Sequence, residues 1–408
     1  MAKVVEVRPE SLEEATRDLP LFAREALRRA AGLRRGALTL NMPDGRALRF
    51  AGPEPGVEAV MTVRDLAFAR RLASSGDLGL AEAFLREEWD SPDLAAFLLL
   101  FASNRDLVAT LLPGKPFVRL WQVFRHLLNR NTRLGARRNI HAHYDLGNRF
   151  YGAWLDPTMT YSAALFAPGD NDLASAQTRK YRAICQAADL RPEHHVLEIG
   201  CGWGGFAEFA ASQIGCRVTG LTISDEQFAF ARRRIAEAGL VDRVEISLLD
   251  YRGERGTYDR IVSIEMFEAV GERFWPTFFR QMRDRLVAGG RAGLQVITIR
   301  EDSFDWYRRE IDFIRRYVFP GGMLPSPAVL RDLGRRSGLP IQGERIFGLD
   351  YAATLTHWRE RFRAAWPDLA PLGFDERFRR LWEYYLAYCE AGFRSGNIDV
   401  RQVVFAKV

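Results

Sequence analysis

Residues 196–205 read Val-Leu-Glu-Ile-Gly-Cys-Gly-Trp-Gly-Gly, an apolar run that ends in a glycine-rich turn. The apolar run predicts a buried β-strand, and residues 206–211 predict the start of a helix. Gly200, Gly202 and Gly204 would let the backbone approach a ligand closely. This order indicates the first βα unit of a nucleotide-binding α/β fold, although a tight βα turn without a ligand has the same pattern.

The residues around the turn decide between nucleotides. A dinucleotide fold places an acidic residue about 20 residues further on, at the end of the second strand. Residues 216–222 contain no carboxylate, and the turn lacks the Lys-Ser/Thr pair of a triphosphate loop. Glu198, at the carboxyl end of the first strand, would instead meet a cationic or hydroxylated ligand. S-adenosylmethionine, with its ammonium and sulfonium groups, fits that position better than an anionic pyrophosphate.

From about residue 141 onward, strand-like segments alternate with helical ones, which is typical of an α/β fold with a doubly wound, mostly parallel sheet. Seven strands suit the Rossmann-like sheet of class I methyltransferases. The predicted strands are 195–199, 217–221, 244–248, 260–264, 292–297, 341–347 and 400–405.

The segment before this fold predicts a smaller α+β domain. Helical patterns at 13–31 and 107–112 accompany a hairpin signal at 41–46. We expect an N-terminal α+β domain at 1–125, for dimerisation or substrate presentation. A basic linker at 126–140 and a methyltransferase domain at 141–408 would follow it.

Composition limits the class of protein. The chain has 408 residues, a net charge of +6 and only four lysines, so that arginine carries nearly all of the positive charge. Such a surface suits anionic headgroups, although arginine bias also arises without function. The longest apolar stretch, 94–102, is far shorter than the ~18 residues that span a bilayer. The four scattered cysteines predict neither a metal site nor disulfides, and we expect a cytoplasmic protein.

A segment at 300–325 is rich in aromatic residues and arginine, and it follows a strand's carboxyl end, where open α/β sheets bind ligands. Helical spacing predicts that Trp306, Phe313 and Tyr317 lie near one another. The same spacing turns most arginines of 308–316 outward. A helix packed on the core and a lid that contacts lipid both remain open. Nucleic acid fits less well because no binding motif accompanies the charge.

Several blocks occur together along the chain. Residues 143–151 read His-Tyr-Asp-Leu-Gly-Asn-Arg-Phe-Tyr, residues 264–268 read Ile-Glu-Met-Phe-Glu, and residues 319–326 read Phe-Pro-Gly-Gly-Met-Leu-Pro-Ser. Further blocks lie at 155–162, 220–224 and 392–400. Together with the glycine turn they resemble the cyclopropane-fatty-acyl-phospholipid synthases and their mycolic-acid-modifying relatives. The resemblance covers roughly 141–408 and is looser before it.

The resemblance implies methyl transfer from S-adenosylmethionine to a cis double bond of a phospholipid acyl chain. The alkene is the nucleophile, so that catalysis rests on positioning and on shielding a carbocation. A proton is then lost from the new methyl group, and members of the family are understood to use a bound bicarbonate as the base. Besides Glu198, the implied cofactor-binding residues are Tyr161, Ser162, Gly200, Gly202, Thr222, Gln227, Asp250 and Tyr251.

The implied bicarbonate site departs from the family pattern. Glu268 and Tyr351 match it, and Ile297 matches a position that contributes its backbone N–H. Ala163 stands where many members have cysteine, and Gln295 stands where many have histidine. A glutamine can hydrogen-bond an anion but cannot hold a proton near neutral pH. A cyclopropane, a methyl-branched chain and a methylated diene therefore remain open as products.

Glu265 lies three residues before Glu268. It could face the same pocket, but we interpret it as an ordinary salt-bridged carboxylate.

The main hypothesis is an S-adenosylmethionine-dependent C-methyltransferase that acts on unsaturated acyl chains of membrane phospholipids. We expect a homodimer, peripheral on the inner face of the membrane, that docks on an anionic lipid surface and binds no nucleic acid. A methyltransferase for a small soluble acceptor and a non-catalytic lipid-binding relative are the alternatives.

Overall fold

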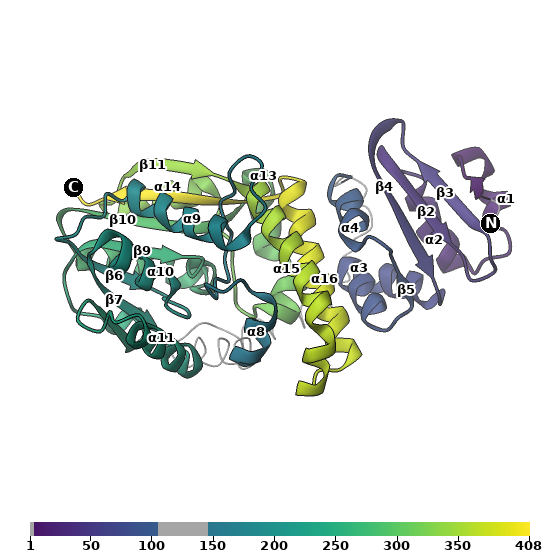
Figure 1. The fold of residues 1–408 in the computed structure, drawn as a ribbon. Coiled ribbons are helices and arrows are strands. Elements are labelled where there is room, and N and C mark those ends of the chain that lie inside the picture. Colours follow the sequence, from purple (N-terminus) through teal and green to yellow (C-terminus); the bar gives the residue numbers. More distant parts are fainter. Residues whose placement is uncertain (1–3, 105–145) are drawn as a thin grey trace. The chain divides into compact units, whose positions relative to one another are not determined.

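The computed structural model describes residues 4–104 and 146–408, and the described residues form two compact units. Unit 1 takes its described residues from 1–123, 310–314 and 370–397. Unit 2 takes its described residues from 124–309, 315–369 and 398–408. Each unit has its own sheet (Figure 1).

Unit 2 is built on a seven-stranded sheet in the order β11-β12-β10-β9-β6-β7-β8. Strand β12 runs antiparallel to both of its neighbours, and the other pairings are parallel, so that the predicted mostly parallel sheet is confirmed. All seven predicted strands are present. Their bounds are β6 (His195–Ile199), β7 (Arg217–Thr222), β8 (Val244–Leu248), β9 (Tyr258–Ile264), β10 (Leu286–Ile299), β11 (Ile341–Ile346) and β12 (Ile398–Ala406).

Helices cover both faces of this sheet because successive strand side chains point to opposite sides. On β6, Val196 packs with the buried side chains of α9 (Leu173–Ala187), α10 (Gly205–Phe209) and α11 (Asp225–Glu237). Leu197 and Ile199 pack with those of α12 (Trp275–Arg285) and α14 (Pro327–Arg336). Further helical segments of unit 2 include α8 (Asn148–Trp154), η2 (Ala210–Ile214), η3 (Tyr251–Gly253), η4 (Phe267–Ala269), η5 (Glu272–Phe274) and α15 (Gly348–Leu369).

Unit 1 contains a five-stranded sheet in the order β1-β3-β2-β4-β5. The predicted hairpin is present, because Asn41 and Ala47 pair across the turn that joins β2 and β3. The helix predicted at 13–31 is divided at Pro20, which cannot donate a helical hydrogen bond and precedes the second helix. The strands are β1 (Val4–Glu6), β2 (Arg35–Asn41), β3 (Ala47–Ala51), β4 (Glu54–Val63) and β5 (Trp89–Asp90), with helices η1 (Pro9–Ser11), α1 (Leu12–Thr16), α2 (Leu21–Ala30), α3 (Ala67–Leu85) and α4 (Leu94–Ala102).

Two late segments also belong to unit 1, namely η7 (Ala370–Leu372) and α16 (Glu376–Arg394). The buried guanidinium of Arg380 on α16 donates to the carbonyl oxygens of Phe84 and Trp89 at 2.7 and 3.0 Å. The expected division into 1–125 and 141–408 therefore differs from the observed units, because α16 packs with the N-terminal part of the chain. The helical pattern at 107–112 and the linker at 126–140 lie outside the described residues.

The segment 300–325 differs from its expected arrangement. It forms α13 (Glu301–Arg309) and the π-helical turn η6 (Ile314–Val318), so that Phe313 is not in one helix with Trp306. Trp306 is 49% exposed in unit 2, whereas Phe313 is buried in unit 1 against the rings of Tyr384 and Tyr388. The continuous helical spacing that predicted the aromatic cluster therefore does not hold across this segment.

Arg315 also departs from its predicted outward position. Its guanidinium is buried and donates to the carbonyl oxygen of Tyr307 at 3.0 Å. Across the described ranges, no helix combines the length and the apolar character needed to cross a membrane.

Candidate active site at the carboxyl ends of the parallel strands

The glycine turn after β6 has the tight conformation that its sequence predicts. The backbone N–H groups of Gly200 and Cys201 both donate to the carbonyl oxygen of Leu221, at 3.0 and 2.8 Å. Gly200 has a φ of +85° and Gly202 a φ of +53°, in the left-handed region that favours glycine. A Cβ atom on Gly200 would lie 2.6 Å from Cγ of Met266. The first glycine is therefore required by conformation and by space.

Glu198 lies on β6 next to this turn, with its side chain buried. One of its carboxylate oxygens has no hydrogen-bond partner among the described residues. Burial raises the pKa of Glu198 to about 8, against the opposing charges of Lys180 and Arg234. Such a buried, unsatisfied oxygen is costly unless a bound group meets it, which agrees with the ligand contact predicted for Glu198.

Thr222 and Gln227 contact each other at the end of β7, the strand that follows the glycine turn. The hydroxyl of Thr222 donates to Oε1 of Gln227 at 3.0 Å, and both side chains are buried. The N–H of Ser224 donates to the same hydroxyl, and Ser224 caps α11. The two predicted residues therefore stand together at the carboxyl end of β7.

Asp250 and Tyr251 lie in the turn after β8. The Asp250 carboxylate accepts hydrogen bonds from the backbone N–H and the guanidinium of Arg252. The Tyr251 ring packs edge-on against Phe278, with a centroid distance of 5.4 Å. Asp250 is thus already bound to Arg252, which fixes the loop in which the family resemblance implies a contact with the cofactor.

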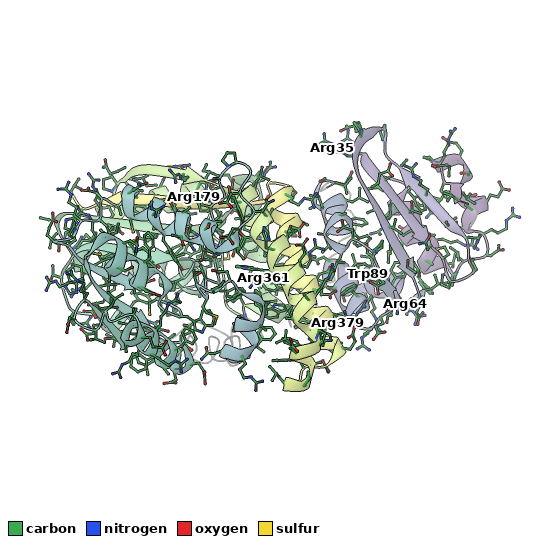
Figure 2. All side chains as sticks on the ribbon, in the orientation of Figure 1. Arg35, Arg64, Trp89, Arg179, Arg361 and Arg379 are labelled. Carbon is green, nitrogen blue, oxygen red and sulfur yellow. The ribbon has the colours of Figure 1, made fainter. Side chains whose placement is uncertain are left out.

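The segment with Tyr161 and Ser162 is held by helices on either side of it. Arg361 on α15, which Figure 2 labels, donates to the carbonyl oxygens of Trp154 and Leu155 at 2.8 and 2.7 Å. The Tyr161 ring lies 5.6 Å from Trp154 and 5.2 Å from Trp358 between centroids. Tyr161 therefore belongs to a packed aromatic cluster of unit 2.

Ser162 is bound to Lys180, a residue that the sequence did not single out. The Lys180 ammonium donates to the Ser162 hydroxyl at 2.7 Å, and Lys180 on α9 is fully buried. Burial lowers the pKa of Lys180 to about 7, although the charges of Glu265, Asp156 and Glu198 oppose this shift. A lysine at an inward position of an amphipathic helix was the available signal.

Glu265 lies at the centre of the residues expected to form the base site. Its Oε1 accepts a hydrogen bond from the Ala163 N–H at 2.8 Å and another from Nε2 of Gln295 at 2.7 Å. Its Oε2 accepts a hydrogen bond from the Tyr351 hydroxyl at 2.6 Å. The interpretation of Glu265 as an ordinary salt-bridged carboxylate is wrong, because these three donors are neutral groups of the site.

The backbone places Glu265 in this position. Its φ of +49° lies in the left-handed region, which is uncommon for a residue with a side chain. The Glu265 N–H donates to the carbonyl oxygen of Gln295 at 2.8 Å, which fixes the turn after β9. Burial raises the pKa of Glu265, while its bonds to Tyr351 and Gln295 oppose the rise.

Gln295 is oriented by bonds at both ends of its amide. Nε2 donates to Glu265 and also, at 3.3 Å, to the carbonyl oxygen of Ala163. Oε1 accepts a hydrogen bond from Nε2 of Gln402 on β12 at 3.1 Å. The amide therefore takes part in a fixed network.

Glu268 and Ile297 form a second, smaller contact. The Ile297 N–H donates to Oε1 of Glu268 at 2.5 Å, and Oε2 of Glu268 is buried with no partner among the described residues. Burial, and next the charge of Glu265, raises the pKa of Glu268 to about 8. Burial and the charge of Glu265 therefore favour the protonated form of Glu268.

Helix α15 brings Tyr351 to this place. Its Thr354 hydroxyl accepts a hydrogen bond from the Ala164 N–H at 3.0 Å, and its Asp350 carboxylate accepts one from the Phe166 N–H at 2.7 Å.

Met266, which follows Glu265, lies against Gly200. The residue next to Glu265 therefore contacts the glycine turn. Among the described residues, no cluster of His, Cys, Asp and Glu has the arrangement of a metal site.

Known proteins resemble both the sequence and the structure. A family model described as mycolic acid cyclopropane synthetase matches residues 131–403. A tuberculostearic acid methyltransferase of Mycobacterium tuberculosis is 41% identical over 400 residues, which cover 94% of this chain and 92% of that protein. A cyclopropane-fatty-acyl-phospholipid synthase of Escherichia coli K12 is 37% identical over 355 residues, which cover 86% of this chain and 88% of that protein.

Two solved structures share the fold of 66% of this chain and 98% of their own chains. The cyclopropane synthase MmaA2 from Mycobacterium tuberculosis has a TM-score of 0.63 and 31% identity. The mycolic acid cyclopropane synthase CmaA1, complexed with SAH and CTAB, has a TM-score of 0.62 and 30% identity.

Proposed function

The chain belongs to the mycolic acid cyclopropane synthetase family, and from this premise we propose that it methylates a double-bond carbon in unsaturated acyl chains of membrane phospholipids. The predicted family, fold class and class of enzyme are confirmed. The enzyme is an S-adenosylmethionine-dependent methyltransferase that acts on fatty-acyl unsaturation. What we propose beyond this is that the acyl chain belongs to a membrane phospholipid, and how the proton is lost to give the product.

The glycine turn fits S-adenosylmethionine. A side chain at Gly200 would clash with Met266, and Glu198 offers a buried oxygen that lacks a partner among the described residues. S-adenosylmethionine supplies an electrophilic methyl group at this place. Gly200, Gly202 and Glu198 would hold it, with Thr222 and Gln227 at the end of β7. The CmaA1 structure, which contains SAH, supports this choice of cofactor.

The contact between the glycine turn and Met266, the residue next to Glu265, is the observation that carries the proposal. Methylation of an alkene leaves a carbocation on the acyl chain. A fixed negative group beside it lowers the barrier, because an oriented charge in a buried site needs little reorganisation. Glu265 is such a group, and its three donors hold it in place. A methyltransferase for a heteroatom of a small soluble acceptor has no cation of this kind to stabilise.

We also place the enzyme at a membrane surface as part of this proposal. Helix α13 carries Trp306, which is half exposed, together with Arg308 and Arg309. Tryptophan partitions to the membrane interface, and arginine binds anionic headgroups. The name of the Escherichia coli relative supports a phospholipid substrate.

The test supplies the purified protein with methyl-labelled S-adenosylmethionine and one of two kinds of acceptor. The first is vesicles of monounsaturated phosphatidylglycerol, and the second is a panel of small soluble amines and phenols. We expect label in the vesicle lipid, and a slower reaction when a neutral phospholipid replaces phosphatidylglycerol. Label in the soluble acceptors alone would overturn the proposal, and label in neither would favour a non-catalytic lipid-binding protein.

A further inference from the structure

We propose that the Glu265 side chain takes the place of the bound bicarbonate, so that this enzyme carries its own base for the loss of the proton. The inference rests on the proposed function, because it concerns the second step of the same reaction. It assigns a catalytic role to a residue that sequence analysis had set aside.

The hydrogen-bond donors expected to hold bicarbonate are already engaged by carboxylates of this chain. The Ala163 N–H, the Gln295 amide and the Tyr351 hydroxyl all donate to Glu265, at 2.8, 2.7 and 2.6 Å. The remaining expected donor, the Ile297 N–H, donates to Glu268. A bicarbonate on these donors would have to displace the Glu265 carboxylate, which carries the same charge and the same kind of oxygen.

The donors also fix the protonation of one of the two carboxylate oxygens. A backbone N–H and an amide Nε2 can only donate, so Oε1 of Glu265 accepts two hydrogen bonds and carries no proton. A carboxylate has about four lone-pair sites, and three are used by the described donors. Glu265 thus retains capacity to accept a proton from the acyl chain.

The neighbouring residues are less suited than Glu265 to act as the base. Gln295 cannot take up a proton near neutral pH. Glu268 faces the charge of Glu265 and is buried with a single hydrogen-bond donor. The positive φ of Glu265 directs its side chain to the three donors, and backbone strain of this kind is often kept at functional sites.

The step balances within the substrate and Glu265. The carbocation already holds the transferred methyl group. One C–H bond of that methyl breaks, and its electron pair forms a C–C bond to the neighbouring cationic carbon, which closes a cyclopropane. If a 1,2-hydride shift first moves the positive charge to the carbon that bears the methyl, the same electron pair instead forms the second bond of a methylene C=C. The proton goes to the Glu265 carboxylate, which becomes a neutral acid and returns the proton to water after release of the product.

The test measures turnover on monounsaturated phosphatidylglycerol vesicles in CO2-free buffer and in buffer with added bicarbonate. The wild-type rate is expected to agree within about twofold between the two, since a base built into the chain needs none from solution. Glu265→Gly leaves a residue that suits the positive φ and empties the carboxylate position. Its rate should fall by roughly 10²–10⁴ and recover at least about tenfold with bicarbonate.

Glu265→Gln is the matched control, because its amide fills the same space but cannot accept the proton. It should be as slow as Glu265→Gly and should gain nothing from bicarbonate. A wild-type enzyme that loses most of its rate in CO2-free buffer would overturn the inference. So would a Glu265→Gly variant that keeps the wild-type rate in that buffer, or a rescue of Glu265→Gln.

A binding measurement separates this inference from the proposed function. Line broadening of ¹³C-bicarbonate in NMR reports binding without any turnover. We expect broadening with Glu265→Gly and none with the wild type or Glu265→Gln. Equal broadening by the wild type and Glu265→Gly would refute the replacement of bicarbonate, even if the enzyme methylates lipid. The expected pattern without methylation of lipid in either buffer would refute the proposed function alone.

Discussion

Glu265 and Glu268 come from one short turn but have different surroundings. Three neutral donors bind the Glu265 carboxylate, whereas Glu268 has one donor and a buried oxygen without a partner among the described residues. The two groups can therefore take separate roles, because a carboxylate with more donors is stabilised in its charged form. Glu265 would accept the proton while Glu268 stays mainly neutral.

Replacing Glu268 by glutamine should change how stability depends on pH. Folding raises the pKa of Glu268 from its ordinary value of 4.5 to about 8. Between these values the folded protein holds a proton that the unfolded chain has released, so the free energy of unfolding decreases as pH rises. The loss over this window is on the order of a few kcal/mol, at about 1.4 kcal/mol per pKa unit.

Glu268→Gln lacks this titration, so the variant should gain stability relative to the wild type from pH 5 to 8. Thermal unfolding at several pH values measures the difference. The titration of Lys180 makes the free energy of unfolding increase with pH between about pH 7 and pH 10.5. Lys180 is present in both proteins, so its effect cancels in the comparison. Parallel curves for the two proteins would show that Glu268 is already ionised when folded.

Gly200→Ala should weaken the glycine turn. The variant forces a side chain into a left-handed conformation, at a cost of about 1–2 kcal/mol, and places its Cβ 2.6 Å from Met266. Gly202→Ala is the control, because φ is also positive there but no atom lies within 4 Å of the added Cβ. Calorimetric titration with SAH should show a larger loss of affinity for Gly200→Ala. Equal losses would mean that the Met266 contact has no influence.

Single residues of the site were partly predictable from the sequence. Ala163, Gln295 and Tyr351 were expected together, and they do meet. The central position of Glu265 was missed, because a positive φ on a non-glycine residue leaves no mark in the sequence. Lys180 was missed because its role depends on burial among groups from other elements.

Strands were the elements that the sequence predicted best. A central parallel strand is buried on both faces and appears as a short apolar run before a turn, as β6 does. The edge strand β8 instead alternates between buried and exposed residues, and both strands have their predicted bounds. Helices were harder to predict where an aromatic pattern with helical spacing continued past the end of a helix. The segment 300–325 kept its helical spacing, yet its path turns between α13 and η6, and Phe313 is buried in unit 1.

Trp306→Ala on α13 should weaken docking on anionic lipid. The side chain is half exposed, and an interfacial tryptophan would contribute by burying its ring among headgroups. We expect several-fold weaker binding to phosphatidylglycerol vesicles in a sedimentation assay, with unchanged affinity for SAH. Val241→Ala is the control, because Val241 is also exposed but lies before β8, at the amino ends of the parallel strands. Equal losses in both variants would exclude α13 as the docking element.

At the scale of the whole molecule, the chain is divided differently from the expected domains. Helix α16 belongs to unit 1 although it comes from the end of the chain. The sequence could not show this, because the contacts of Arg380 with Phe84 and Trp89 join residues almost 300 positions apart. An amphipathic helix pattern identifies a buried face but does not identify its partner.

Arg380→Met should therefore destabilise unit 1. The change removes the guanidinium donor from the buried carbonyl oxygen of Trp89, whereas the carbonyl oxygen of Phe84 still accepts a hydrogen bond from the Glu87 N–H at 3.0 Å, so that we expect a cost of about 1–3 kcal/mol. Arg379→Met is the matched control, because Arg379 is more exposed and pairs with Glu376 on its own helix, which is worth about 0–1 kcal/mol. Urea unfolding followed by tryptophan fluorescence should show an earlier transition for Arg380→Met alone. Equal midpoints would show that this contact contributes little.

The most direct single measurement is mass spectrometry of the acyl chains after reaction of the purified enzyme with trideuteromethyl S-adenosylmethionine and monounsaturated phosphatidylglycerol. We expect a labelled carbon on the acyl chain that keeps two of its three deuterons, because the base removes the third from the new methyl group. Acyl chains that gain no labelled carbon, while S-adenosylmethionine is consumed, would contradict methyl transfer to the double bond.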